Sequence, residues 1–394
     1  MNIDVVITGA ARTPIGKFGG SLRTQSASDL GTVTSLGSLK KSGVRADSVD
    51  EVIFGNARQA GVRANVARQI AYRTGLGDSV PAYKINKACG SSLKAILNAY
   101  GAIALGDAEV VLAGGTESMS NTPYLLVDAR WGERLGHAKV VDAMYHDGFH
   151  CPLSDLLMGD TAENLADRYE ITREEADRYA VETQQRCEQA RALGNFKDEI
   201  VPITIQNETS GVEVIDVDSH PRNGVSFDSL QELTPVFRKG GVVHAGNSSG
   251  ITDGAASVVV LSKEKACALG VVPMARIVGY SSSGVDPAYM GIGPVAAIRN
   301  LLDKTGLSLN DVDLIELNEA FAVQVLACHR ELNLDLTRVN VNGGAIALGH
   351  PIGATGARIV VTLLYEMKKR AVKRGIAALC ISGGMGLALL VENL

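Results

Sequence analysis

The sequence predicts an α/β protein with two similar mixed-sheet core domains in α/β/α layers and a loop domain inserted between them. An internal duplication carries this prediction. Residues 39–57 align without gaps with residues 302–320, and each copy reads as the end of a helix, a glycine stop and a strand. A second, weaker match pairs residues 83–86 with residues 338–342, each followed by a glycine-rich turn, a helix and an apolar strand. Two matches in the same order indicate two copies of one α/β unit.

The predicted elements divide the chain into three parts. Alternating helices and strands predict largely parallel strand pairing within each copy. A strand predicted over residues 255–261 continues the first copy after the insertion. The predicted boundaries are residues 1–120 plus 248–270 for the N-terminal core domain, 121–247 for the loop domain and 271–394 for the C-terminal core domain.

The inserted region contains two predicted helices. The first is expected to begin at Asp160, with Glu163 three residues later, and the second at Thr172, with Glu175 in the matching place. Both starts have the spacing of a capping box. The second helix is expected to stop at Gly194. The surrounding stretches are polar and irregular, which is typical of a segment that covers a ligand.

Composition narrows the class of protein. The 394 residues carry a net charge of −5, which argues against a nucleic-acid platform. No apolar run approaches the length of a membrane span. A strand predicted at residues 3–8 leaves no room for a signal peptide, and the six cysteines are scattered without a C-x-x-C pair. These features predict a reducing, cytoplasmic location, without a zinc site or a disulfide framework.

Cys89 is the strongest candidate for a reactive side chain. A strand predicted over residues 82–86 runs into this cysteine, and a helical pattern begins within two residues and lasts until Gly106. The unpaired N–H groups at a helix start favour negative charge, so the sequence predicts a thiol that tends toward thiolate. The alternative is a small buried core cysteine. The glycine and serines that follow leave the thiol open to a ligand, which favours a nucleophile.

Three further segments carry candidate chemistry. His350 lies between Gly349 and Pro351 in a glycine-rich turn, which favours a fixed ring over a solvated histidine. Cys380 ends an apolar strand, where α/β folds place their sites, although a buried core cysteine fits as well. Asn318 and Glu319 follow another strand, and their alternative role is helix capping.

At this point the sequence resembles a known family. The segments NKACGSSLKA, NEAFA, GGAIALGHPIGATGAR and CISGGMG, in this order and spacing, resemble the thiolases, specifically the acetyl-CoA acetyltransferases. The match covers essentially the whole chain, from TGAARTPIGKFGGSL to the last strand. The resemblance implies the thiolase fold and a ping-pong acyl transfer.

The resemblance also implies catalytic roles. Cys89 is expected to attack a thioester, and His350 to accept the thiol proton and hold the thioester oxygen in its anionic form. Cys380 is expected to act as the second acid and base. Asn318 is expected to position a water that forms one oxyanion hole with His350. The backbone N–H groups of Cys89 and Ser382 are expected to form the other.

For coenzyme A and the acyl group, the resemblance implies contacts in the loop domain and in nearby turns. The positions that match these contacts are Arg222, Ser229, Ser249, Met158, Met290 and Phe321. The sequence departs from short-chain biosynthetic thiolases at Leu157, where they usually carry histidine. This replacement puts acetoacetyl-CoA specificity in doubt and favours a longer or branched acyl chain.

The expected activity is reversible condensation of two acetyl-CoA to acetoacetyl-CoA and CoA. The alternatives are a 3-ketoacyl-CoA thiolase of broader chain length in fatty-acid β-oxidation and a non-catalytic thioester-binding protein. A decarboxylating condensing enzyme uses two histidines beside its cysteine, and Cys380 argues against that class. We expect no metal, no organic cofactor, no nucleic-acid or membrane partner, and a homotetramer formed as a dimer of dimers.

Overall fold

A computed structural model describes residues 3–207 and 211–394 of the chain, so residues 208–210 of the predicted loop domain lie outside it. Its main feature is one mixed ten-stranded sheet in the order β4-β3-β5-β12-β1-β13-β16-β15-β14, with β2 paired to β12. The strands are β1 (Val5–Arg12), β2 (Gly16–Lys17), β3 (Glu51–Gly55), β4 (Ala82–Ile85), β5 (Val110–Ser118), β12 (Thr252–Ser262), β13 (Ala275–Gly284), β14 (Leu314–Leu317), β15 (Arg374–Ile381) and β16 (Met385–Asn393).

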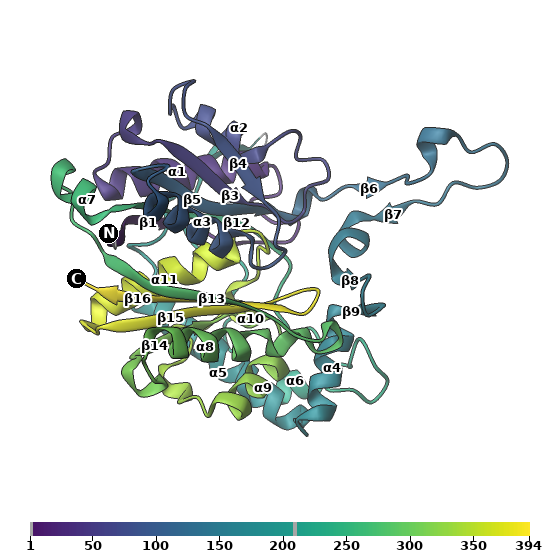
Figure 1. Cartoon of the computed structure of the whole chain (residues 1–394). Helices are drawn as coiled ribbons and strands as arrows, with labels where there is room; N and C mark the ends of the chain where they lie inside the picture. Colours follow the sequence, from purple (N-terminus) through teal and green to yellow (C-terminus); the bar gives the residue numbers. More distant parts are fainter. Residues whose placement is uncertain (1–2, 208–210) are drawn as a thin grey trace.

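Helices pack against this sheet and form apolar clusters with its strands. They are α1 (Ala27–Ser42), α2 (Val66–Arg73), α3 (Ser91–Leu105), α7 (Lys263–Leu269), α8 (Gly293–Thr305), α9 (Ala322–Leu332), α10 (Ala345–Leu348) and α11 (Thr355–Arg370). One apolar cluster joins α1 and α2 to the N-terminal strands, and another joins α8 and α9 to the C-terminal strands. A third places α3 and α11 between the two sets of strands, as Figure 1 shows. The predicted α/β/α layering of two similar halves is therefore confirmed.

The duplicated segments adopt the same local structure. Helix α1 ends at a left-handed Gly43 and leads through a 3₁₀ turn to β3, and α8 ends at a left-handed Gly306 and leads in the same way to β14. Glycine suits both ends because it has no Cβ to clash at positive φ. The weaker match between residues 83–86 and 338–342 also holds. In the first half β4 pairs in parallel with β3, and in the second half Val339 forms the corresponding parallel bridge with Ile315 of β14.

The expectation of largely parallel pairing is wrong. Strand β3 runs parallel to β4 and β5, and β14 runs parallel to β15, but the other pairings of the main sheet are antiparallel. In the C-terminal half a tight turn between β15 and β16 forces this, since a hairpin joins antiparallel strands. Sequence periodicity does not distinguish the two pairings when both faces of a sheet are buried.

The two halves meet at main-chain distance around the start of α11. A Cβ added to Gly115 would lie 2.1 Å from the carbonyl oxygen of Gly353, and one added to Gly356 would lie 2.5 Å from the amide nitrogen of Leu93. The Ser92 hydroxyl accepts a hydrogen bond of 2.9 Å from the Ala357 amide. These contacts fix the starts of α3 and α11 relative to each other.

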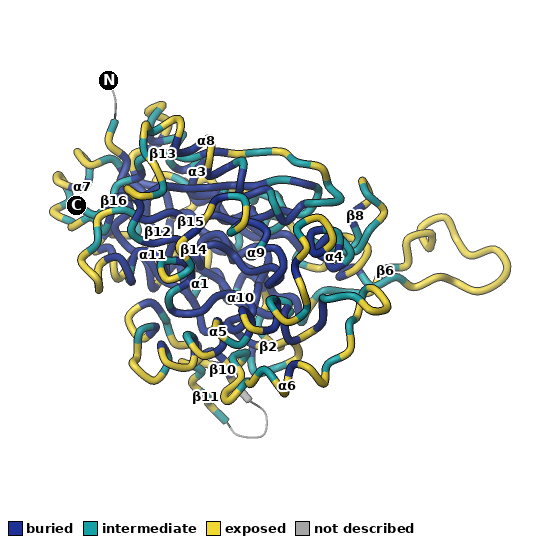
Figure 2. Tube along the Cα trace, turned by 90° about the horizontal axis from the view of Figure 1, so that it is seen from below, coloured by how far each residue is buried: buried dark blue, intermediate teal, exposed yellow. Residues whose placement is uncertain are grey.

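The inserted region spans the side of the molecule. Its elements are β6 (Tyr124–Leu125), β7 (Val141–Asp142), β8 (His150–Cys151), β9 (Leu156–Leu157), α4 (Met158–Arg168), α5 (Arg173–Ala192), β10 (Ile203–Asn207), β11 (Gly211–Ile215) and α6 (Phe227–Gln231). The segment around β6 and β7 extends away from the body as an arm, and it is exposed along its outer part in Figure 2.

One predicted helix start in this region is wrong, and the other is confirmed. Helix α4 begins at Met158, and Asp160 accepts a hydrogen bond from the Leu157 amide inside its first turn. Glu163 is buried and accepts hydrogen bonds from the backbone of residues 242–243, so it anchors a distant segment instead of capping the helix. Thr172 and Glu175 form the expected capping box of α5.

The three domain boundaries stay predictions. Within residues 3–207 and 211–394, no helix is both long and apolar enough to span a bilayer.

Candidate active site

The Cys89 turn is held in an unusual backbone conformation. Ala88 has a φ of +44°, a region that an alanine rarely adopts. The Asn86 side chain accepts a hydrogen bond of 2.9 Å from the Ala88 amide, and the Ser91 hydroxyl donates one of 2.6 Å to the Ala88 carbonyl. The same hydroxyl accepts from the Lys87 amide at 2.9 Å. These bonds offset the strain and place Cys89 just before α3, as the sequence predicts.

The electrostatics of Cys89 differ from the expectation. Burial raises the pKa of its thiol above the usual value, although a hydrogen bond from the Ser382 amide, the charge of Arg58 and its own amide each lower it. The expectation that the thiol ionises easily is wrong, because the loss of solvation outweighs these donors. The thiol therefore needs a base to remove its proton. The Ser382 amide lies against the Cys89 sulfur as a hydrogen-bond donor.

His350 is positioned to be that base. Its Nδ1 lies 2.6 Å from the Thr355 hydroxyl, which donates its single hydrogen to the Pro351 carbonyl at 3.0 Å. Nδ1 therefore carries a proton, and the lone pair is on Nε2, a buried atom with no hydrogen-bond partner among the described residues. Burial and the charges of Arg358 and Arg58 lower the pKa of His350 to about 3, so the ring is neutral at physiological pH.

Cys380 lies near the end of β15 with only 1% of its surface exposed. Burial raises the pKa of its thiol well above the usual value, and repulsion by the neighbouring Cys89 and Cys328 thiols would oppose its ionisation further. Cys380 therefore carries its proton at neutral pH. Cys380 and Cys89 line the same pocket.

One pocket brings these groups together. Cys89, His350, Cys380 and Ser382 all line it. Five of the residues expected to bind coenzyme A or the acyl group line it too, namely Leu157, Met158, Ser249, Met290 and Phe321. Residues from both halves of the duplicated core and from the inserted region thus converge on one site.

Three predicted residues do not line this pocket. Arg222 and Ser229 are exposed, and the Ser229 hydroxyl donates to the Ser226 carbonyl at 2.7 Å as part of the cap of α6. Asn318 is fully buried behind the wall, where its backbone N–H donates to the Ala378 carbonyl. Neither polar atom of the Asn318 side chain has a hydrogen-bond partner in the described part of the chain.

Glu319 has a different role from helix capping. Helix α9 begins at Ala322, so neither Asn318 nor Glu319 is its N-cap, and the alternative assigned to both is wrong. The buried Glu319 carboxylate accepts hydrogen bonds from Tyr179 at 2.8 Å, from Thr183 and Asn340 at 2.9 Å, and from the backbone at 346. It ties α5 to the glycine-rich turn that leads to His350.

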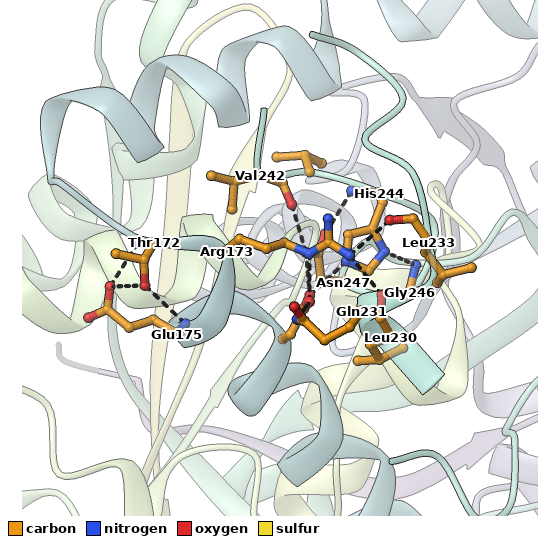
Figure 3. A network of polar contacts seen from close by, with 12 residues as sticks. Thr172, Arg173, Glu175, Leu230, Gln231, Leu233, Val242, His244, Gly246 and Asn247 are labelled. Carbon is orange, nitrogen blue, oxygen red and sulfur yellow. Dashed lines mark hydrogen bonds and ion pairs between the residues drawn. The ribbon is translucent and has the colours of Figure 1, made fainter. Parts of the chain in front are cut away.

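A second buried network, drawn in Figure 3, includes Asn247, two residues before the Ser249 that lines the pocket. The Asp177 carboxylate on α5 accepts hydrogen bonds from His244 Nε2 and Arg173 Nε at 2.6 Å and from Asn247 Nδ2 at 2.9 Å. The Gly246 amide donates to His244 Nδ1, which fixes this tautomer. The polar turn that begins at His244 is therefore attached firmly to the inserted region.

Sequence reasoning missed several groups of the site. Arg58, Tyr145 and Phe149 line the pocket. Arg58 lies in the loop after β3, and Tyr145 and Phe149 are the two ends of a short π-helix in the inserted region, so none of them belongs to a recognisable motif. Glu117 is fully buried in β5 and accepts hydrogen bonds from three backbone amides, including that of Gly353. A lone glutamate inside an apolar strand was the signal that could have found it. No group of three or more potential ligands within residues 3–207 and 211–394 suits a metal ion, and the expected lack of a metal or cofactor stays a prediction.

Comparisons with known proteins define the class. Residues 5–264 match the N-terminal domain model of the thiolases and residues 271–393 match the C-terminal one. The chain belongs to the thiolase family and is an acyltransferase, as its resemblance predicts. It is 50% identical to the acetyl-CoA acetyltransferase of Syntrophomonas wolfei, with all of both chains covered. It is 53% identical to that of Pseudomonas aeruginosa, with 98% of each covered.

Solved structures of thiolases have the same fold as this chain. The acetyl-CoA acetyltransferase of Bacillus anthracis superposes with a TM-score of 0.97 at 48% identity, with all of both chains covered. Human mitochondrial 3-ketoacyl-CoA thiolase in complex with CoA superposes with a TM-score of 0.96 at 43% identity, covering 100% of this chain and 98% of that one.

Proposed function

We propose that this protein is an acetyl-CoA C-acetyltransferase that reversibly condenses two acetyl-CoA to acetoacetyl-CoA and CoA. Full-length relatives at about half identity with this name support the assignment. The observation that carries it is one pocket lined by two thiols, Cys89 and Cys380, and by a neutral imidazole, His350. This set can form a thioester and also move a second proton.

In the first half-reaction the Cys89 sulfur attacks the acetyl carbonyl. The lone pair on His350 Nε2 accepts the thiol proton, which the raised pKa of Cys89 makes necessary. The bond from the carbonyl to the CoA sulfur breaks, and Cys380, which begins as a thiol, protonates the leaving CoA sulfur. The enzyme then carries an acetyl thioester on Cys89, a thiolate on Cys380 and a protonated His350.

In the second half-reaction the Cys380 thiolate removes a proton from C2 of another acetyl-CoA. The resulting carbanion attacks the acetyl carbonyl on Cys89, and the Cys89 sulfur leaves and regains its proton from His350. Protons balance over the cycle, and each group returns to its starting state. Thiolysis runs the same steps in reverse.

Two oxyanion sites serve these steps. The amides of Cys89 and Ser382 both act on the Cys89 sulfur, so they are close enough to the reacting carbonyl to stabilise its oxygen. Asn318, whose buried amide forms no bond to the described protein, is suited to hold a water that serves His350 at the second site. Each donor of this kind contributes about 3 kcal/mol to the transition state.

Coenzyme A is proposed to enter beside Ser249, with Phe321 and Met290 as apolar walls. The complex of a 43% identical thiolase with CoA supports this ligand. Arg222 and Ser229 remain candidates for the nucleotide end, which extends to the surface where both are exposed. No cofactor is needed, because the thioester itself supplies the activated acyl group.

A 3-ketoacyl-CoA thiolase of broader chain length, acting in fatty-acid metabolism, is the second candidate. Leu157 in the pocket favours it, because an apolar side chain replaces a polar one beside the acyl path. A relative structure with the name 3-ketoacyl-CoA thiolase fits it as well.

We also propose a cytoplasmic homotetramer assembled through the arm. Trp131 is 90% exposed and Leu135 is 96% exposed at its outer end. Large apolar side chains so exposed are typical of an interface between protein chains.

Thiolysis tests the proposal. Acetoacetyl-CoA mixed with CoA should lose its enolate absorbance in the presence of the enzyme, and Cys89→Ser should abolish the loss. A Cys89→Ser enzyme with full activity would refute the assigned nucleophile. Activity that stays level or rises as the 3-ketoacyl chain lengthens beyond four carbons would select the second candidate.

A further inference from the structure

Arg58 is a cation in the pocket that the proposed reaction does not use. It follows β3 and lines the same pocket as Cys89 and His350, with only 5% of its surface exposed. The side chains around this end of the pocket are mainly apolar, since a cluster of Ala57, Met119, Met144 and Ile352 packs here against Cys89 and Phe149. A guanidinium in such a setting requires a partner, because an unpaired buried charge is costly.

The described residues provide Arg58 with few hydrogen-bond acceptors and with no paired carboxylate. No carboxylate forms an ion pair with Arg58 among the ion pairs of residues 3–207 and 211–394. Its Nη1 has a single long hydrogen bond of 3.5 Å to the Asp147 carbonyl, and its buried Nε has none to the described chain. An arginine has five N–H donors, so most of its capacity is free for a ligand.

Glu117 does not neutralise the guanidinium directly. Its carboxylate accepts hydrogen bonds from the Asn56 side chain at 2.7 Å and from the amides of Ala57, Arg58 and Gly353 at 2.7–3.0 Å. Four donors therefore already satisfy its two oxygens. The charge of Glu117 acts on Arg58 only from a distance.

The guanidinium is also held in place. It lies over the ring of Phe149, with the central carbon 5.2 Å from the ring centroid. A Cβ added to Gly148 would lie within 2.1 Å of three guanidinium atoms, so the group rests flat against the Gly148 backbone. A fixed, planar cation of this kind binds a carboxylate through two parallel hydrogen bonds.

We propose that Arg58 binds a carboxylate at the far end of the acyl group, so that the enzyme also accepts thioesters of dicarboxylic acids and their 3-keto derivatives. The inference rests on the proposed thiolase function and extends its substrate class. The acyl carbon is bound to Cys89, the chain crosses the apolar cluster, and the terminal carboxylate pairs with Arg58. A methyl-ended chain of the same length leaves the guanidinium unpaired.

Thiolysis of matched substrates tests the proposal. The pairs are 3-oxohexanoyl-CoA with 3-oxoadipyl-CoA, and 3-oxooctanoyl-CoA with 3-oxosuberyl-CoA, which differ only in a terminal methyl or carboxylate. We expect kcat/KM for the carboxylate-ended member of at least one pair to equal or exceed that of its partner. In Arg58→Met this ratio should fall by about tenfold to a hundredfold, the loss of one charge-assisted hydrogen bond or two.

The ratio isolates recognition from other effects of the substitution. The charge of Arg58 also lowers the pKa values of Cys89 and His350, so its loss changes acylation by both members of a pair alike and cancels in the ratio. Arg58→Lys should retain more of the ratio than Arg58→Met. Arg23→Met removes the same charge from an exposed position outside the pocket and should leave the ratio unchanged.

Two results would overturn the proposal. If both carboxylate-ended substrates are cleaved at least tenfold less efficiently than their partners while acetoacetyl-CoA is cleaved, the thiolase function stands and the role of Arg58 is purely structural. An equal ratio in wild type and Arg58→Met leads to the same conclusion. Failure to cleave acetoacetyl-CoA as well would instead refute the function on which the inference rests.

Discussion

The hydrogen bond between Thr355 and His350 offers a sharp test of the proposed chemistry. Thr355→Val keeps the shape of the side chain but removes the hydroxyl that lies 2.6 Å from His350 Nδ1 and 3.0 Å from the Pro351 carbonyl. The ring then loses the partner that fixes its proton on Nδ1. The substitution therefore acts on the proposed base without touching the substrate pocket, which Thr355 does not line.

The magnitude follows from the charge that develops on the ring. A neutral hydrogen bond contributes about 1 kcal/mol, and a bond to a charged group contributes about 1.5–3 kcal/mol. The bond to Thr355 strengthens as His350 takes the Cys89 proton, so its loss costs the transition state about 1–2 kcal/mol more than the ground state. Acylation should slow about tenfold, and unfolding stability should fall by roughly 1–2 kcal/mol for the two lost bonds.

Single-turnover kinetics measure this step directly. Excess enzyme is mixed with acetoacetyl-CoA without added CoA, and loss of the enolate reports acylation of Cys89. Thr355→Ser is the matched control, because it retains the hydroxyl, and should keep most of the wild-type rate. If Thr355→Val acylates as fast as Thr355→Ser, the assignment of the proton to Nδ1 and of base function to Nε2 is refuted.

Three other predictions concern pH, folding and assembly. The pKa of His350 is about 3 in the folded state and about 6.5 ordinarily, so acidification protonates the unfolded state first and lowers stability. In urea unfolding, wild type should lose roughly 1.4 kcal/mol of unfolding free energy per pH unit below 6.5 relative to His350→Gln. Equal dependence of the two stabilities on pH would contradict this. Glu319→Gln should lower the free energy of unfolding by about 3 kcal/mol, because buried donors lose their acceptor. Glu174→Gln, at an exposed position, should change the stability little. Equal thermal midpoints of the two variants would show that Glu319 does not anchor α5. Trp131→Asp should reduce the mass seen by light scattering to that of a dimer, and an unchanged tetramer would exclude the arm as the interface.

The sequence predicted those features that local patterns determine. The duplicated helix–glycine–strand unit, the turn at Cys89 and the capping box at Thr172 all depend on neighbouring residues, and each is present in the structure. The strand directions were not predictable in this way, because buried parallel and antiparallel strands have the same apolar composition. Helix α4 begins earlier than expected because Asp160 lies in its first turn and accepts a hydrogen bond from the Leu157 amide, so Asp160 is not the cap. Glu163 bonds instead to residues eighty positions away, which no local window contains.

The site was predictable to the extent that motifs mark it. Cys89, His350 and Cys380 were found because glycines or strand ends surround them, and they do line one pocket. The raised pKa of Cys89 was missed because burial depends on the tertiary structure, whereas the helix start is visible in the sequence. Arg58 was missed for the same reason, since a loop arginine is usually solvated.

The contact between the two halves at Gly115 and Gly353 has an evolutionary consequence. The two halves meet there through main-chain atoms with no room for a side chain, and Gly353 follows His350 by only three residues, so this contact helps to fix the turn that carries the imidazole. Natural variation at positions such as Arg58 and Leu157 can therefore change which acyl groups are accepted while the reaction stays the same. Members of such a family can change their substrate range while the arrangement of the catalytic residues is kept.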